Sequence, residues 1–274
     1  MTGDHPPTTL HHRSDGPPGA PVLVLGPSLG TDLHLFDAQV AALAGRYRIV
    51  RFDLPGHGGS PAPDGLCSIR GMARDVLALL DRLGIDRFHY AGVSIGGAIG
   101  QQLAVDHPER LRSLTVCASA ARFADPDSWP QRAATVRAHG TEAMLASRPG
   151  TWFTHRFADN HSAEATRLLD MLRATTREGY AGCCEAIATF DLRERLGAIS
   201  VPTLAIAGAD DPATPPEMVR LISDGVQHGG FVLIRDAAHL VNAERPDQVT
   251  TALVEHLERV DGPASASDDA GRRR

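Results

Sequence analysis

A chain of 274 residues is long enough for one large domain, or for one domain that carries an insertion. Its hydrophobic content of 42% and charged content of 22% are ordinary for a globular protein, and no run approaches the roughly 18 apolar residues that cross a bilayer. The net charge of -6 provides no basic excess to displace counterions from phosphates, so the composition argues against nucleic-acid and membrane partners.

The four cysteines and thirteen histidines do not form a recognisable metal motif. Cys183 and Cys184 are adjacent and cannot easily bridge each other, while Cys67 and Cys117 lack the spacing of metal ligands. The N-terminal stretch MTGDHPPTTLHHRSDG has no apolar core and does not predict a secretory signal. We therefore expect a cytoplasmic protein with reduced thiols and no metal.

Short apolar runs predict the strands of a parallel sheet. Strands that are apolar on both faces are typical of a sheet covered by helices on both sides. Between the early runs, residues 69–84 place Met72, Val76 and Leu80 at helical spacing. The alternation of strands and helices predicts a mostly parallel, doubly wound α/β domain. The six runs are PVLVLG (21–26), YRIVRFD (47–53), RFHYAGV (87–93), LRSLTVCAS (111–119), PTLAIAGAD (202–210) and GFVLIRDAA (230–238).

The run that ends at Val93 leads into a serine between two glycines. The sequence Gly92-Val93-Ser94-Ile95-Gly96 matches G-x-S-x-G, the pattern of a nucleophile elbow, in which a strand turns sharply into a helix. The serine of such a turn has a strained backbone, so the residues two positions away must be small. Short Gly/Ser patterns also occur by chance, so the rest of the chain has to supply partners for Ser94.

The alternation of strands and helices stops between residues 121 and 196. This segment is rich in helix-like sequence, such as DPDSWPQRAATVRAHGTEAML and AEATRLLDMLRATT. The sequence predicts a helical cap over 121–196, inserted into a core formed by 20–120 and 197–260, at the sheet edge where α/β domains bind ligands. Residues 1–19 and 261–274 are polar and are predicted to be flexible.

A serine hydroxyl is a poor nucleophile at neutral pH and needs a histidine oriented by a carboxylate. Both residue types follow Ser94, each after a late strand-like run. His239 is the predicted base. Asp211 is the predicted acid because of its spacing from the strand end, and Asp210 is the alternative. His57, in the turn DLPGHGGS, is predicted to have a structural role.

An oxyanion hole requires two backbone N–H groups directed at the charge that develops on the substrate. One should come from Ile95, directly after the nucleophile. The other should come from the loop after the first strand, where Leu29 lies in Ser28-Leu29-Gly30. A neighbouring amide of that loop is the alternative to Leu29.

With these residues in view, the chain resembles the α/β-hydrolases, and among them the 3-oxoadipate enol-lactonases of the β-ketoadipate pathway. The resemblance spans roughly 20–260 and is carried by SLGTDLHLFDAQ, AARFADPDSWPQRAATVR, EGYAGCCEAIATFDLRERLG, IAGADDPATPPEM and AAHLVNAERP. It implies that Ser94 opens the ring of a small anionic lactone without a cofactor. It also implies a functional or covalent link to a carboxymuconolactone decarboxylase, at the polar C-terminal tail. The oligomeric state, a homo-oligomer included, is left open.

An anionic substrate in an acidic protein requires a local cation, and arginine suits a carboxylate because its planar fork donates two hydrogen bonds. The cap segment contains Arg122, Arg132, Arg137, Arg148 and Arg156. Arg132 is the predicted partner, since it follows Trp129 by about one helical turn and shares its helix face. Trp152 is predicted as a second wall of the substrate site.

Other functions remain open on the same fold. The predicted triad serves a carboxylesterase or a cofactor-free haloperoxidase-like perhydrolase equally well, and only the cap separates these from a lactonase. An epoxide hydrolase or haloalkane dehalogenase is disfavoured because Ser94 stands where those enzymes use aspartate. A small-molecule receptor on a hydrolase fold is the alternative of another class.

Overall fold

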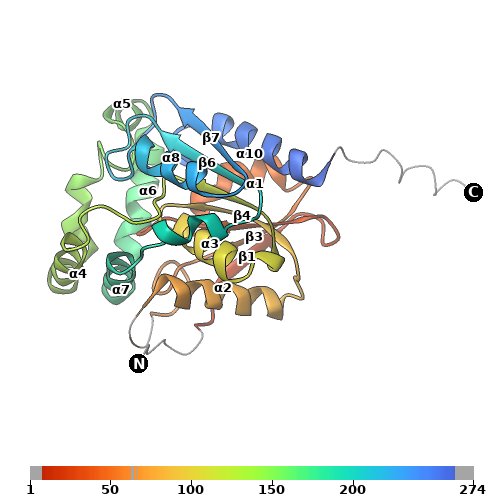
Figure 1. Ribbon diagram of the computed structural model, residues 1–274. Coiled ribbons are helices and arrows are strands. Elements are labelled where there is room, and N and C mark those ends of the chain that lie inside the picture. The colour runs from red at the N-terminus through yellow and green to blue at the C-terminus, as the bar shows by residue number, and fades with distance from the viewer. Residues whose placement is uncertain (1–7, 63–64, 66, 263–274) are drawn as a thin grey trace, which may run out of the picture.

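The computed structural model describes residues 8–62, 65 and 67–262. Seven strands form one sheet in the order β1-β3-β2-β4-β5-β6-β7, and helices lie on both sides of it (Figure 1). Only β1 is antiparallel to its neighbour; the other five pairs are parallel. The strands are β1 (His12–Asp15), β2 (Val22–Gly26), β3 (Arg48–Phe52), β4 (Phe88–Val93), β5 (Leu111–Cys117), β6 (Thr203–Gly208) and β7 (Gly229–Ile234).

The helices divide into those around the sheet and those between β5 and β6. The first group consists of α1 (Asp37–Leu43), α2 (Ile69–Arg82), α3 (Ile95–Asp106), α8 (Pro216–Gly225), α9 (Val241–Glu244) and α10 (Pro246–Asp261). The second consists of α4 (Ser128–His139), α5 (His155–Asn160), α6 (Ser162–Ala174) and α7 (Arg177–Ala188), which gather beyond one end of the sheet in Figure 1. Short 3₁₀ helices connect them: η1 (Leu33–Phe36), η2 (Pro108–Arg110), η3 (Thr141–Ser147) and η4 (Arg193–Ala198).

The α/β fold predicted from the apolar runs is confirmed, and each of the six runs contains a strand. Every residue of the inner strands β4 and β6 is buried, which explains why their sequences are apolar on both faces. The predicted helix 69–84 is α2, which begins after Ser68, whose hydroxyl accepts a hydrogen bond from the Gly71 amide at 2.9 Å.

The prediction of a flexible N-terminal tail over 1–19 is wrong for residues 12–15, which form β1. This strand lies at the sheet edge, where its polar side chains reach water, so its sequence lacks the apolar pattern of a buried strand. Asp15 at its end pairs with the buried Arg51 at 2.9 Å. Residues 1–7 lie outside the described part of the chain.

The predicted C-terminal tail also begins too early. Asp261 is the last residue of α10, and its carboxylate lies 2.8 Å from Arg112 and 3.1 Å from His89. These polar contacts keep the end of α10 against the sheet, which a composition-based reading of DGPASASDDAGRRR does not reveal. Residues 263–274 lie outside the described residues.

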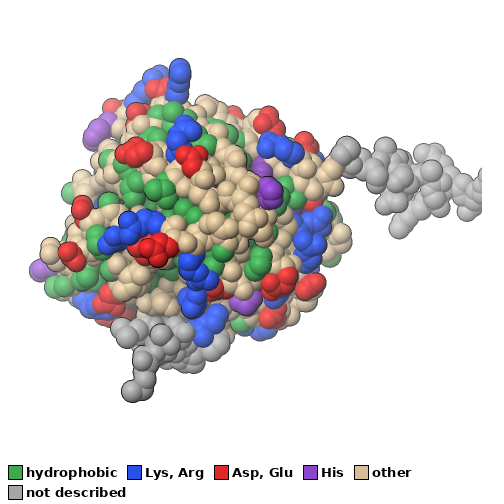
Figure 2. Space-filling view, in the orientation of Figure 1, with side chains coloured by type: hydrophobic (Ala, Val, Ile, Leu, Met, Phe, Trp, Pro, Cys, Tyr) green, Lys and Arg blue, Asp and Glu red, His purple; other side chains and the backbone are tan. Residues whose placement is uncertain are grey.

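The surface carries both signs of charge. Figure 2 shows arginine and carboxylate side chains interspersed over the visible face, as expected for a chain with 27 basic and 33 acidic residues. Among the helices of the described residues, none has the length and apolarity needed to span a membrane.

Candidate active site

Ser94 occupies the sharp turn between β4 and α3. Its backbone has φ 56° and ψ -117°, a conformation that residues other than glycine rarely adopt. Its amide donates a hydrogen bond to the Cys117 carbonyl at 2.9 Å. A Cβ atom on Gly92 would lie 2.3 Å from the backbone carbon of Gly96, and one on Gly96 would lie 2.2 Å from the carbonyl oxygen of Gly26. The two glycines therefore allow the elbow to fold against β2.

Asp211 and His239 follow the ends of β6 and β7, the two strands beyond β5 in the sheet. The Nδ1 atom of His239 lies 2.9 Å from Oδ2 of Asp211, and both side chains are buried. Asp211 also accepts hydrogen bonds from the hydroxyl of Thr214 at 2.6 Å and from the amides of Ala213 and Thr214 at 2.8 and 3.1 Å. These bonds hold the carboxylate next to Nδ1 of His239.

The electrostatics of Asp211 favour its ionised form. Burial alone would raise the pKa of this carboxyl, but His239 and the hydrogen bonds from Thr214 outweigh burial and hold the pKa below its usual range. Asp210, by contrast, is exposed, and its amide donates to the Ala237 carbonyl at 2.9 Å. The structure thus brings Asp211, rather than Asp210, to His239.

The loop after β2 approaches the elbow and is held by His57. His57 is fully buried; its Nε2 accepts the amide of Gly30 at 3.0 Å, and its Nδ1 lies 3.0 Å from the Pro55 carbonyl. Burial lowers the pKa of His57 to about 4, so the ring is neutral and keeps one nitrogen as an acceptor. Because the Gly30 amide is occupied, the alternative oxyanion donor on that side of Leu29 is disfavoured.

The backbone N–H groups of Leu29 and Ile95 donate no hydrogen bond within the described residues. Ile95 is the first residue of α3, where an amide has no partner inside the helix. Leu29 lies in the loop that meets Ser94 at the same cavity. Both amides are therefore available to a ligand.

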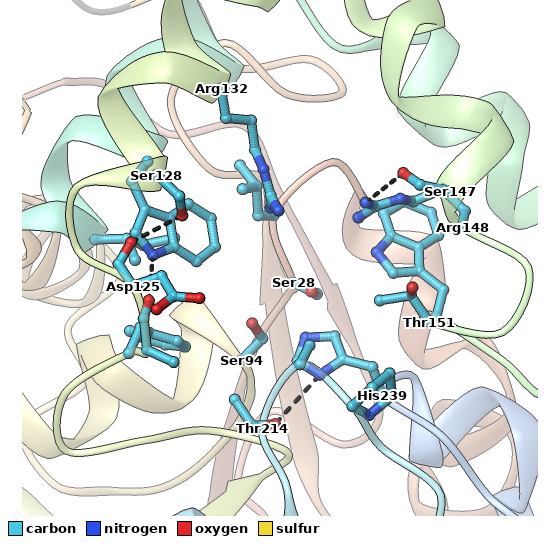
Figure 3. Close-up of a pocket in the computed structure, with 18 of the residues that line it drawn as sticks. Ser28, Ser94, Asp125, Ser128, Arg132, Ser147, Arg148, Thr151, Thr214 and His239 are labelled. Carbon is cyan, nitrogen blue, oxygen red and sulfur yellow. Dashed lines mark hydrogen bonds between the residues drawn. The ribbon is translucent and has the colours of Figure 1, made fainter.

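Ser94 and His239 lie at the floor of a cavity of about 370 Å³, with Thr214 and Ser28 beside them (Figure 3). Within the described residues, the hydrogen bonds of the His239 ring are made by Nδ1, to Asp211 and Thr214. Its Nε2 is consequently the nitrogen left for a proton from the cavity. Among the described residues, Ser94 Oγ and His239 Nε2 do not form a hydrogen bond. In many enzymes this bond forms only when substrate is bound.

The opposite wall of the cavity comes from α4 and from the segment around η3. Trp129, Arg132 and Trp152, predicted from the sequence, all line it. The guanidinium of Arg132 stacks over the Trp129 ring, 4.4 Å from its centroid. Trp129 also donates its indole N–H to the Ala124 carbonyl at 3.1 Å, which fixes the ring.

Only part of this wall could be selected from the sequence. Of the five cap arginines considered from the sequence, Arg132 and Arg148 line the cavity, whereas Arg137 pairs with Glu178 and Glu185 and Arg122 lies 3.8 Å from Asp191. The helical spacing from Trp129 identified Arg132. Arg148 follows no such pattern, because it reaches the cavity through the fold of η3. Other lining residues that the sequence did not single out are Asp125, Ser128, Ser147, Thr151 and Tyr180.

Comparison with known proteins agrees with the fold. A family model for the alpha/beta hydrolase fold matches residues 21–246. The chain is 38% identical over 240 residues to 3-oxoadipate enol-lactonase 1 of Acinetobacter baylyi, covering 88% of this chain and 90% of that protein. The crystal structure of the enol-lactonase from Burkholderia xenovorans LB400 has a TM-score of 0.89 and 38% identity, covering 93% of this chain and 98% of that chain.

A third relative has a different activity. The structure of a thermophilic esterase from Thermogutta terrifontis, with malate bound, has a TM-score of 0.87 and 28% identity, covering 92% of this chain and 94% of that chain. The family match covers most of the sequence, and the relatives cover nearly the whole of it. The chain therefore belongs to the α/β-hydrolase family, in which it is an enol-lactonase-like hydrolase.

Proposed function

We propose that this protein hydrolyses the enol-lactone of 3-oxoadipate to 3-oxoadipate, as a step in aromatic catabolism, through an acyl-enzyme on Ser94. The observation that carries the proposal is the meeting of a strained elbow serine with the Asp211–His239 pair at the floor of one cavity. The named activity of two relatives at 38% identity supports the choice of a lactone.

In the first half-reaction His239 Nε2 takes the hydroxyl proton of Ser94 while Oγ attacks the lactone carbonyl. The oxyanion of the tetrahedral intermediate accepts hydrogen bonds from the amides of Leu29 and Ile95. The ring C–O bond then breaks, and the enolate oxygen receives the proton from His239. An enolate is a better leaving group than an alkoxide. The enol formed by ring opening remains part of the acyl group on Ser94 and tautomerises there to the ketone.

In the second half-reaction a water molecule gives a proton to His239 Nε2 and its oxygen attacks the acyl carbon. The bond between that carbon and Ser94 Oγ breaks, Oγ recovers its proton from His239, and the product leaves as a carboxylic acid, which gives its proton to water. Asp211 keeps the Nδ1–H tautomer in place through the 2.9 Å bond and stabilises the imidazolium that forms twice per cycle. No step requires a metal or an organic cofactor.

The cap selects for a small carboxylate. Trp129 and Trp152 supply flat apolar walls for the ring, and Arg132 supplies a cation within the same cavity. A relative crystallised with malate, a small dicarboxylate, supports a ligand of this class. Charge-assisted hydrogen bonds to a carboxylate are stronger than neutral ones, so they can hold one end of the lactone while its carbonyl meets Ser94.

Carboxylic ester hydrolysis is the second candidate function, because the relative from Thermogutta terrifontis is an esterase and the same triad would act on an open-chain ester. The experiment is an ultraviolet assay of purified protein with freshly generated enol-lactone, run beside neutral esters. We expect kcat/KM for the lactone to exceed that for the esters by at least about a hundred-fold, the discrimination available from one well-placed ionic contact.

Three results would point elsewhere. Equal or higher kcat/KM on the neutral esters would favour the esterase. Turnover of peroxide with a carboxylic acid, without lactone opening, would favour a perhydrolase. A single turnover that leaves a stable adduct would favour a receptor.

A further inference from the structure

Arg148 is the most deeply buried cation of the cavity. Only 6% of its surface is exposed, and within the described residues its hydrogen bonds go to neutral acceptors: Nε to the Met144 carbonyl at 3.2 Å and Nη2 to the Ser147 hydroxyl at 2.9 Å. Burial lowers the pKa of Arg148, and nearby Arg132 lowers it further. A buried guanidinium that lacks a carboxylate is costly, so its retention calls for a ligand.

A second buried arginine shows the usual arrangement. Arg51 is 3% exposed and meets two carboxylates, Asp37 at 2.6 Å and Asp15 at 2.9 Å. Its charge is therefore balanced inside the fold. No carboxylate of the described residues lies within 4 Å of the nitrogens of Arg148 or of Arg132, so neither guanidinium has an ion-pair partner among them. Asp125 also lines the cavity, but it is exposed and pairs with neither arginine.

The two guanidinium groups converge. Figure 3 shows the guanidinium of Arg132, from α4, and that of Arg148, directly after η3, both in the part of the cavity above Ser94. Burial raises the pKa of the Tyr180 hydroxyl, and both arginines oppose that rise, as expected if both lie close to it. Each is also stacked on a tryptophan, Arg132 at 4.4 Å from the Trp129 centroid and Arg148 at 5.6 Å from that of Trp152.

We propose that Arg148 and Arg132 bind the same carboxylate of the substrate from two sides, and that Arg148 is a specificity-determining residue of the site. This inference rests on the proposed function and extends it. One carboxylate has about four lone-pair positions, enough for a guanidinium on each side. The Nη1 atom of Arg148 has no hydrogen-bond partner within the described residues, so its N–H groups remain for the ligand. A neutral ligand would leave both guanidinium groups without a counter-ion, which would select against it.

The test uses hydrolysis of 4-nitrophenyl acetate as a reporter and adipate as a competitive inhibitor, with uncharged adipamide as the matched control ligand. In Arg148→Gln and in Arg132→Gln we expect the inhibition constant of adipate to rise about ten- to a hundred-fold. If both arginines bind one carboxylate, the double variant should lose less than the product of the single losses. Arg122→Gln, which removes an arginine that does not line the cavity, should keep the wild-type inhibition constant.

Because Arg148 is buried, each variant is first compared with the wild type by thermal unfolding. If Arg148→Gln does not fold, Arg148→Lys replaces it: the charge remains but the planar fork is lost, and adipate inhibition should weaken by about ten-fold. A folded Arg148 variant of either kind with wild-type inhibition would overturn the proposal. So would adipamide that inhibits as well as adipate.

The outcome separates this inference from the proposed function. If adipate inhibition depends on both arginines but the protein does not open the enol-lactone, the two-arginine subsite is supported and the proposed substrate is wrong. If the protein opens the lactone rapidly but adipate inhibition does not change in the Arg148 variants, the proposed function is supported and the two-arginine subsite is wrong.

Discussion

The backbone of Ser94 adopts dihedral angles that an unconstrained serine rarely visits, φ 56° and ψ -117°. The surrounding glycines and the hydrogen bond from its amide to Cys117 hold it there, and neither depends on the hydroxyl. We therefore expect Ser94→Ala to keep the thermal midpoint of the wild type within a few degrees and to lose turnover by about 10⁴-fold or more. Residual activity close to that of the wild type would show that another nucleophile acts.

The two neighbouring aspartates have separate environments. Asp211 meets His239 at 2.9 Å, whereas Asp210 is exposed. Asp211→Asn should reduce kcat by on the order of 10³–10⁴-fold, because the amide favours the wrong tautomer of His239, while circular dichroism remains unchanged. Asp210→Asn is the matched control and should change kcat less than about two-fold. Reversed effects would transfer the role to Asp210.

His57 supports the oxyanion loop through its bond to the Gly30 amide. In His57→Ala that buried N–H loses its acceptor, which should lower the free energy of unfolding by about 1–3 kcal/mol. His57→Gln offers a carbonyl acceptor in its place and should recover part of the loss. Urea titration measures both. If His57→Ala is as inactive as His239→Ala and as stable as the wild type, His57 has a catalytic role instead.

At the scale of elements, one buried carboxylate connects the cap segment to the loop that carries His239. Glu244, at the end of α9, is 3% exposed and accepts the Ala238 amide at 2.9 Å, the Thr154 amide at 3.2 Å and the Thr154 hydroxyl. In the same region the amide of His239 donates to the Thr151 carbonyl at 3.2 Å. The base of the predicted triad is therefore positioned partly by the cap.

Replacing Glu244 should loosen this connection. Glu244→Gln removes the charge from three hydrogen bonds, so we expect a loss of about 2–3 kcal/mol in the free energy of unfolding and a lower kcat. Glu255→Gln, an exposed glutamate of α10, is the control and should change neither. A Glu244→Gln protein that retains wild-type kcat would show that the cap and the His239 loop are positioned independently.

The sequence predicts those helices and strands whose buried faces produce a regular spacing of apolar residues. The apolar runs of β4 and β6 and the period of α2 follow directly from two-sided or one-sided burial. The edge strand β1 has no such pattern, because HRSD faces water. Ser94, Asp211 and His239 can be predicted as a triad from chain order and strand ends, which fix backbone position. Arg148 could not be selected, because its burial and its lack of a carboxylate arise only when η3 packs against the cavity.

For the whole molecule, two buried histidines make stability depend on pH. Burial lowers the pKa of both His57 and His256 from the ordinary value of 6.5 to about 4. Between these pH values the unfolded chain binds protons on these histidines and the folded chain does not. The contribution of the two neutral rings to folding stability is therefore fully present above pH 6.5 and is lost as the pH falls towards 4. Each histidine contributes on the order of 3 kcal/mol to this loss.

Urea unfolding at several pH values from 7 to 4.5 measures this dependence. The depressed pKa of Asp211 acts in the same direction only below the ordinary value of 3.8, so its carboxylate does not contribute to the decline between pH 7 and 4.5. The variant His57→Gln/His256→Gln should show a shallower decline than the wild type. An equal decline in both proteins would mean that other groups govern the acid sensitivity.

The central claim is that Ser94 attacks the carbonyl of a lactone, and the mass of the acyl-enzyme tests it most directly. A lactone keeps its leaving group, so opening it on Ser94 adds the whole mass of the substrate, whereas an open-chain ester adds only its acyl part. We predict that acid quenching within milliseconds of mixing with the enol-lactone, followed by mass spectrometry, will show this full-mass adduct on the peptide that contains Ser94, and that Ser94→Ala will show none. Rapid product formation by the wild type with no adduct on Ser94, or with the adduct on another residue, would contradict the account.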